Sequence, residues 1–269
     1  MFVAGIDIGS ISAETVIVDI DEKKIKNFNI MPTGFKSKEI AEKSFNKALA
    51  DMNLKINDID YIVSTGYGRD NVFFADKQIS EITAHAMGAK FLFPDAKTIL
   101  DVGGQDSKAI SLDSEGNIAD FIMNDKCAAG TGRFLEVMAN VLGAKLSELG
   151  ELSLESENII PISNMCAVFA ESEVISLIHE GYTRQDISKG IHEAIADRSI
   201  GFLNKVGINN SVILTGGVAK NIGFVEAIKN KLYGFEINIP EEPQILGALG
   251  ASLSMNKVKD KIRKVSKVL

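Results

Sequence analysis

Two cysteines, Cys127 and Cys166, are the residues of this chain most suited to metal or redox chemistry. Each follows an Asn or Asp within three residues and precedes an apolar pattern, which predicts a helix that begins at the cysteine. The helix dipole and the free N–H groups favour a thiolate there. Two thiolates do not complete a four-cysteine metal site. The cysteines are therefore inert, or pair with each other, or are joined by two from a second copy of the chain.

Two turns that follow apolar strands have the composition of phosphate-binding loops. Asp7-Ile8-Gly9-Ser10 ends the first predicted strand, and the β-rich segment 14–20 returns as in a hairpin. Loop 9–13 would present N–H groups and hydroxyls, which suit phosphate, although an ordinary hairpin explains this segment by itself. Asp101-Val102-Gly103-Gly104-Gln105-Asp106 repeats the pattern before segment 108–112. The repetition predicts two α/β halves that each direct an Asp and a glycine turn at one cleft.

Charge and composition exclude several classes of protein. The net charge of −7 and its scatter argue against nucleic-acid binding, and the basic residues from Lys257 onward suit a solvated helix face as well as a binding patch. No long apolar run predicts a membrane span, and segment 2–7 indicates a strand entering a turn instead of a signal peptide. Few cysteines and no export signal predict a cytoplasmic protein without a structural disulfide.

The remaining pattern places these motifs on a coarse framework. Glycines at 130 and 132 are unfavourable inside the helix expected behind Cys127, so they mark a bend or its first turn. Gly216 and Gly217 follow a strand and would let the backbone approach a flat ligand. Small residues in 245–252 make that stretch a candidate hinge or domain contact. Further helices are expected at 37–52, 79–88, 168–178 and 187–206, and further strands at 61–65, 159–162, 211–215 and 237–239.

Together, the two phosphate loops and Leu214-Thr215-Gly216-Gly217-Val218 resemble the acetate/sugar kinase–Hsc70–actin superfamily. Segments 64–69, 103–106, 124–134 and 166–176 resemble, more narrowly, the activator ATPases of (R)-2-hydroxyacyl-CoA dehydratases, relatives of the ATPase subunits of benzoyl-CoA reductases. The resemblance implies an α/β fold with two ribonuclease H-like domains and an interdomain nucleotide cleft. The expected domains are 1–96 plus 250–269, and 97–249.

The resemblance also implies roles for particular residues. The family is a homodimer with one bridging 4Fe–4S cluster, to which Cys127 and Cys166 of each copy would contribute. Asp7 and Asp101 would organise Mg²⁺, and Asp101 and Gln105 would place the attacking water. The expected contacts to the phosphates of ATP or ADP are Gly9, Ser10, Ser12, Ala13, Gly103 and Gly104, and those to the adenosine are Gly216, Gly217 and Gln244.

The implied activity is ATP hydrolysis coupled to one-electron transfer from a ferredoxin or flavodoxin to the dehydratase, without a nucleic-acid or membrane partner. Alternatives are a benzoyl-CoA-type or double-cubane-cluster reductase as the electron acceptor, a small-molecule kinase of the same fold, or a nucleotide-gated scaffold. The chain departs from the family at Glu14, where Lys is usual, and at Ile11, where Thr is usual. We expect Glu14 to point away from the nucleotide or to pair with a neighbouring cation.

Overall fold

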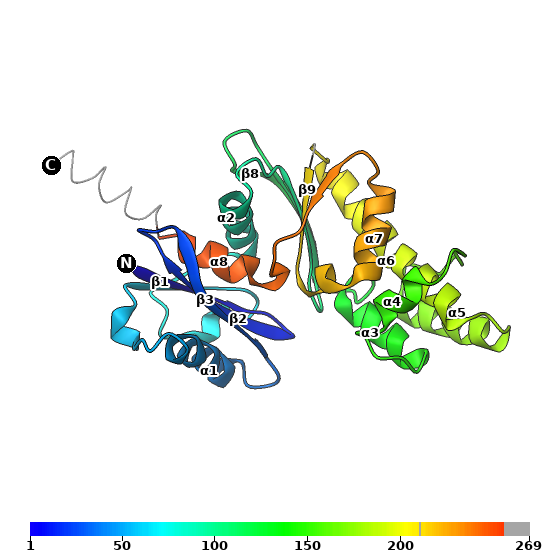
Figure 1. The fold of residues 1–269 in the computed structure, drawn as a ribbon, viewed down its shortest axis with the longest axis horizontal. Coiled ribbons are helices and arrows are strands. Elements are labelled where there is room, and N and C mark those ends of the chain that lie inside the picture. Colours follow the sequence, from blue (N-terminus) through cyan, green and yellow to red (C-terminus); the bar gives the residue numbers. More distant parts are fainter. Residues whose placement is uncertain (210, 256–269) are drawn as a thin grey trace. The chain divides into compact units, whose positions relative to one another are not determined.

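The computed structural model describes residues 1–209 and 211–255, which form two compact units (Figure 1). Unit 1 contains Met1–Asp95 and the segment that starts at Gln244, whereas unit 2 contains Ala96–Pro243. The second boundary therefore lies before the expected one at 249/250, because helix α8 (Leu246–Leu253) packs on the sheet of unit 1. Residues 256–269 of the expected first domain, with the basic stretch from Lys257, lie outside the described residues.

Unit 1 is built on a five-stranded sheet of order β3-β2-β1-β4-β5, with β1 antiparallel to β2 and parallel to β4. Alternate residues of β1 face opposite sides, so Ala4 and Ile6 pack with α1, whereas Val3 packs with α8. Its elements are β1 (Phe2–Ile8), β2 (Ser12–Asp19), β3 (Lys24–Pro32), α1 (Ser37–Ala50), β4 (Tyr61–Thr65), β5 (Lys77–Gln78), α2 (Glu81–Leu92) and α8.

Small residues allow α8 to approach β1 and α2 closely. A Cβ at Gly5 would lie 1.8 Å from the carbonyl oxygen of Ala248, and one at Gly250 would lie 1.7 Å from that of Ala84. Neither position tolerates a side chain without backbone movement. The stretch expected to be a hinge or domain contact is thus a tightly packed helix inside unit 1.

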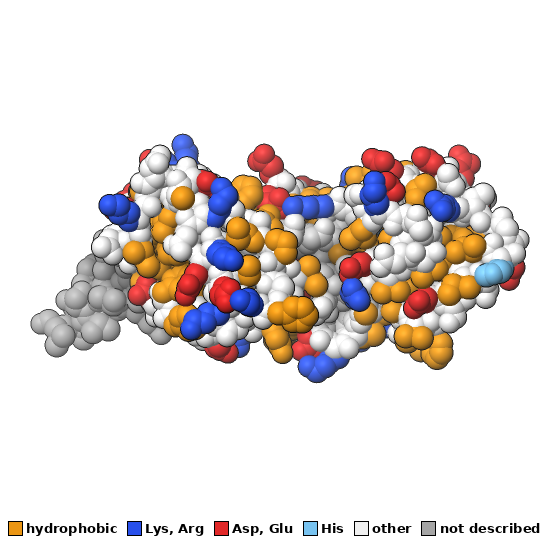
Figure 2. Space-filling model, turned by 90° about the horizontal axis from the view of Figure 1, so that it is seen from below, with side chains coloured by type: hydrophobic (Ala, Val, Ile, Leu, Met, Phe, Trp, Pro, Cys, Tyr) orange, Lys and Arg blue, Asp and Glu red, His pale blue; other side chains and the backbone are white. Residues whose placement is uncertain are grey.

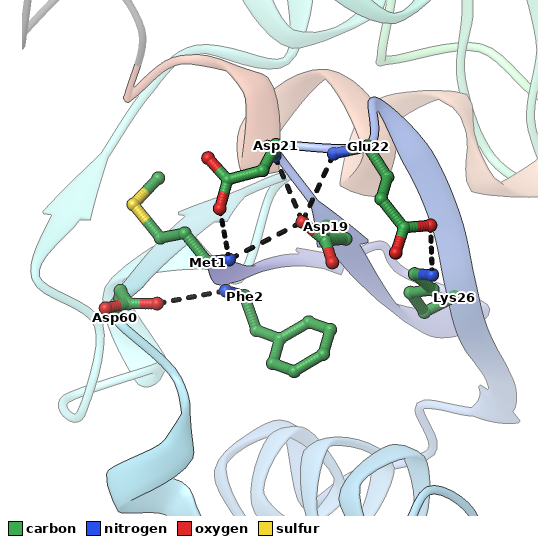
Figure 3. Close-up of polar contacts among 7 residues, drawn as sticks. All are labelled: Met1, Phe2, Asp19, Asp21, Glu22, Lys26 and Asp60. Atoms are coloured by element: carbon green, nitrogen blue, oxygen red, sulfur yellow. Dashed lines mark hydrogen bonds and ion pairs between the residues drawn. The ribbon is translucent and has the colours of Figure 1, made fainter.

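Polar contacts hold the start of β1, at the strand end opposite Asp7 (Figure 3). The amino group of Met1 lies 2.7 Å from Oδ2 of Asp21, whose carboxylate raises the pKa of that amino group. The N–H of Phe2 donates to Oδ2 of Asp60 at 2.9 Å, which ties β1 to the residue preceding β4. These contacts support the register that places Asp7 at the end of β1.

Unit 2 repeats this topology. Its sheet has the order β10-β9-β6-β7-β8, with β6 antiparallel to β7 and parallel to β9. The repeated order and directions confirm the predicted pair of α/β halves. The elements are β6 (Thr98–Val102), β7 (Ser107–Leu112), β8 (Ile118–Asn124), α3 (Gly132–Val141), α4 (Leu149–Leu154), α5 (Ala167–His179), α6 (Arg184–Val206), β9 (Ser211–Thr215), α7 (Ile222–Lys231) and β10 (Glu236–Asn238).

Two expected elements differ in the structure. Segment 159–162 forms no strand. It packs closely against α6, where a Cβ at Gly190 would lie 2.2 Å from the carbonyl oxygen of Ile160. Helix α3 begins at Gly132, five residues after Cys127, so the predicted helix start at that cysteine is wrong. No helix among the described residues is long and apolar enough to cross a membrane.

Candidate functional site

The first phosphate turn is a tight connection between β1 and β2. The N–H of Gly9 donates to the carbonyl oxygen of Ser12 at 2.9 Å, and Oγ1 of Thr33 donates to the carbonyl oxygen of Gly9 at 2.9 Å. Ser10 is exposed at the tip, whereas Ala13 is buried and offers no side-chain surface to a ligand. A phosphate at this turn would therefore meet backbone N–H groups and serine hydroxyls.

Asp7 closes the base of this turn beside two glycines. A Cβ at Gly66 would lie 2.2 Å from Oδ1 of Asp7, and one at Gly247, in the first turn of α8, would lie 2.0 Å from its Oδ2. A helix N-terminus favours a carboxylate at this position. The residue opposite Asp7 on β2 is Glu14, which is only 5% exposed. The turn thus has two carboxylates in register at its base.

The second phosphate turn has a buried lysine at its base. Asp101 accepts from Nζ of Lys108 at 3.1 Å through Oδ2 and from Oγ1 of Thr215 at 2.9 Å through Oδ1. Lys108 also pairs with Oδ2 of Asp106 at 2.5 Å, although its side chain is only 3% exposed. The two ion pairs connect the strand that enters the turn to the turn itself.

The turn itself is closed by Gly103, whose N–H donates to the carbonyl oxygen of Asp106 at 2.9 Å. A Cβ at Gly103 would lie 2.4 Å from Oδ1 of Asp106, so a side chain there would displace the carboxylate that pairs with Lys108. Gln105 is exposed at the tip, whereas Asp101 is 4% exposed with a partner at each carboxylate oxygen. Of the two residues expected to place water, Gln105 has the accessible side chain.

The sequence pattern places Lys108 only on the strand that follows the second phosphate turn, and does not identify it as part of the site. The signal that could have identified it is its spacing from Asp101. A tight turn centred on 103–106 places residues 101 and 108 opposite each other on antiparallel strands, and a lysine there is in register with the aspartate.

The glycine pair expected at the adenosine follows β9. Gly216 adopts φ +85°, and a Cβ there would lie 2.3 Å from the carbonyl oxygen of Val102. Its N–H donates to the carbonyl oxygen of Pro243 at 3.0 Å, while Gly217 is exposed. Gln244 is partly exposed at the start of the segment that returns to unit 1. In unit 1 the corresponding residue is Gly66, also with φ +85°.

Cys127 lies in a braced turn between β8 and α3. The N–H of Cys127 donates to Oδ1 of Asn124 at 3.2 Å, and Nδ2 of Asn124 donates to the carbonyl oxygen of Cys127 at 2.7 Å. At the other end, Oγ1 of Thr131 donates to the carbonyl oxygen of Ala128 at 2.8 Å. The asparagine expected to cap a helix instead holds the cysteine turn.

Cys166 is the N-cap residue of α5, so the predicted helix at this cysteine is present, although no side chain caps it. Both cysteines are free and partly exposed. Apolar side chains beside Cys166 are exposed, with Met165 at 76%, Val168 at 66% and Phe169 at 68%. Figure 2 shows hydrophobic side chains among charged ones at the right-hand end, where α5 lies in Figure 1.

The donor set of one chain fits half of an iron–sulfur site. Thiolates are the usual protein ligands of 4Fe–4S clusters, and four are needed. No group of three or more His, Cys, Asp or Glu side chains within the described residues could hold a metal ion. A cluster at Cys127 and Cys166 would therefore need the same pair from a second copy.

Two sheets of identical topology, each with an Asp-Gly turn at the end of its first strand, define an ATPase of the actin/Hsc70 type. The chain belongs to the BadF/BadG/BcrA/BcrD ATPase family, whose model matches residues 4–254. This confirms the family resemblance carried by the motifs.

Relatives with similar lengths support the assignment. The chain is 49% identical over 253 residues to the activator of lactoyl-CoA dehydratase from Anaerotignum propionicum, covering 94% of this chain and 96% of the relative. It matches (R)-2-hydroxyglutaryl-CoA dehydratase component A from Acidaminococcus fermentans with TM-score 0.90 and 44% identity, covering 94% and 97%. The activator of 2-hydroxyisocaproyl-CoA dehydratase from Clostridium difficile, with bound ADPNP, matches with TM-score 0.90 and 42% identity, covering 98% of each chain.

Proposed function

We propose that this protein is an ATP-dependent one-electron activator of a (R)-2-hydroxyacyl-CoA dehydratase. The observation that carries the proposal is the presence of two free, partly exposed cysteines in the same unit as a phosphate turn. A small-molecule kinase or a chaperone of the same fold has no need of such a pair. The names of the relatives at 42–49% identity agree with the proposal.

ATP would be bound by the two phosphate turns. Ser10 and Ser12 would donate to phosphate oxygens from unit 1, and Gly104 from unit 2. Gly9 and Gly103 would lie against the phosphates and close the two turns, because their N–H groups already donate to the carbonyl oxygens of Ser12 and Asp106. Gly216 and Gly217 would flank the adenosine, with Gln244 beside them. Asp7 is partly exposed at the base of its turn and would orient the waters of Mg²⁺.

Hydrolysis would use Gln105 to orient the attacking water, because this side chain is exposed at the tip of the second turn. Asp101 would contribute through its negative charge and by fixing Lys108, and not as a proton acceptor. Its oxygens already accept from a lysine and a threonine. This assigns the two residues different tasks.

The thiolates of Cys127 and Cys166 would bind a 4Fe–4S cluster together with the same pair from a second copy, in a homodimer of isologous symmetry. Such a cluster supplies one-electron chemistry when it is bound. Asn124 would orient the Cys127 turn, and the position of Cys166 as N-cap of α5 would fix the direction of its side chain. Free thiols of this kind suit the reducing cytoplasm.

The proposed electron acceptor is a dehydratase. This part of the proposal rests on the relatives, whose names specify dehydratases. A ferredoxin or flavodoxin would supply the electron. A benzoyl-CoA-type or double-cubane-cluster reductase is the alternative acceptor, since the same thiolates and turns would serve it.

The test begins with anaerobically purified protein. We expect a brown homodimer with about four iron atoms per dimer. Cys127→Ser and Cys166→Ser should each lose the iron, whereas Met165→Ser, a change at the neighbouring exposed sulfur, should retain it. MgATP hydrolysis and activation of lactoyl-CoA dehydratase with a strong chemical reductant would complete the test. A colourless, iron-free monomer that activates the dehydratase equally well would refute the proposal.

A further inference from the structure

The second phosphate turn is hydrogen-bonded to helix α3, which directly follows the Cys127 turn. The N–H groups of Gly132 and Arg133 donate to the carbonyl oxygens of Gly103 and Gly104 at 2.9 and 2.8 Å. Helix first-turn N–H groups have no partner inside the helix and commonly bind caps or ligands. Here the phosphate turn itself occupies them, so the helix end is attached to the turn and is not a free anion site.

Gly132 also contacts the segment that carries the adenosine glycines. A Cβ at Gly132 would lie 3.3 Å from three atoms: the carbonyl oxygen of Gly103, Cα of Gly104 and Cγ2 of Val218. Val218 directly follows Gly217 and is 5% exposed. The first residue of α3 is therefore the point where the phosphate turn, the adenosine segment and the cysteine-bearing segment meet.

The segment between Cys127 and Gly132 is braced along its length. The side chain of Asn124 accepts from the N–H of Cys127 and donates to its carbonyl oxygen. The N–H and the hydroxyl of Thr131 both donate to the carbonyl oxygen of Ala128. Gly130 packs against the aliphatic part of the Arg198 side chain. A Cβ at Gly130 would lie 2.6 Å from Cγ of that arginine. A displacement of the α3 N-terminus would therefore be passed to Cys127 with little loss in the intervening residues.

We infer that Gly132 is the positioning residue through which nucleotide at the second phosphate turn changes the setting of Cys127. This inference rests on the proposed function and names a route for it within unit 2. Glycine is needed at this contact because a methyl group would separate α3 from both nucleotide segments by a few tenths of an ångström. Cys166, at the start of α5, has no such bond to a phosphate turn among the described residues.

The test compares Gly132→Ala with Gly201→Ala in the anaerobic holoprotein. Gly201 lies on α6 and has open space around it, so it is a matched control for the added methyl group. The measured quantity is the rate at which an iron chelator removes iron, with MgADP and with a nonhydrolysable MgATP analogue. With each nucleotide at saturating concentration, we expect the two rates to differ about tenfold in the wild type and the control, and less than about twofold in Gly132→Ala.

The second arm is hydrogen exchange of the wild-type holoprotein. Exchange in residues 124–134 should change between the same two nucleotide states, together with exchange in residues 103–106. An unaltered rate ratio in Gly132→Ala, or a change in 103–106 without one in 124–134, would overturn the inference and leave the proposed function standing. Wild-type protein without iron or nucleotide binding would instead refute the proposed function.

Discussion

The aspartate at the end of the first strand has a different cross-strand neighbour in each unit. Asp7 faces Glu14 across β1 and β2, whereas Asp101 faces Lys108 across β6 and β7. The next strand carries a threonine in register in both units, Thr65 beside Asp7 and Thr215 beside Asp101. The scaffold is thus the same, and the charge opposite the aspartate is reversed.

Because of this reversed charge, the two phosphate turns differ in whether a lysine or a second carboxylate lies opposite the aspartate. In unit 2 the protein supplies its own cation, and Lys108 holds both Asp101 and Asp106. In unit 1 the residue opposite the aspartate adds a second carboxylate, and like charges directly opposite each other are unfavourable. We therefore expect Mg²⁺ to contribute more to unit 1, while unit 2 is organised before nucleotide arrives.

The largest expected effect follows from removing the buried cation of unit 2. Lys108→Met should destabilise that unit by about 3–5 kcal/mol, because it leaves Asp101 buried without its ionic partner. Denaturant dependence of hydrogen exchange in β6 and β7 would measure this. Lys220→Met, which breaks a partly exposed ion pair with Glu242 in the same unit, should cost at most about 1 kcal/mol. Equal losses in the two variants would show that Lys108 is not a structural cation.

The two units should also differ in how their stability depends on pH, because α6 of unit 2 contains a buried histidine. Burial lowers the pKa of His192 from its ordinary 6.5 to about 4. As the pH falls, the unfolded chain therefore takes up a proton before the folded chain does. The contribution of His192 to the stability of unit 2 should fall by about 3 kcal/mol between pH of about 6.5 and about 4, and should change no further below that range.

The measurement is hydrogen exchange in α6 across that pH range, with exchange in α1 of unit 1 as the internal reference. His192→Leu should remove this part of the pH dependence. A slope that persists in the variant would assign it to other groups.

The sequence predicted the parts of the fold that depend on local pattern. Asp7-Ile8-Gly9 and Asp101-Val102-Gly103 identified both hairpins, because apolar strands bounded by glycine turns have short-range signals. The sequence does not predict strands β3 and β8. Both are edge strands and neither contains a fully buried residue, so neither has the buried apolar run that identifies the inner strands. The helix expected at Cys127 was misplaced because Asn124 braces a turn there instead of capping a helix.

The site was harder to predict where it depends on tertiary contacts. The spacing Asp101 to Lys108 is in the sequence, but the burial that makes Lys108 an ionic partner arises only after the sheet forms. The bonds from Gly132 and Arg133 to the second phosphate turn join residues about thirty positions apart, which no local pattern reports. Glycines at 130 and 132 are unusual beside a helix, and the reason is tertiary: Gly130 packs against Arg198, and Gly132 packs against the second phosphate turn.

The smallest expected effect tests the reversed charge directly. Glu14→Lys would give unit 1 the cross-strand pair of unit 2, so we expect unit 1 to gain about 1 kcal/mol and to depend less on Mg²⁺ for nucleotide binding. Glu14→Gln removes the negative charge without adding a cation, and should give a smaller gain. Hydrogen exchange in β1 and β2 and calorimetric titration with ATP at several Mg²⁺ concentrations would measure both. If neither variant alters β1 or the Mg²⁺ dependence, the carboxylate of Glu14 does not act on Asp7, and the two turns differ in sequence without differing in electrostatics.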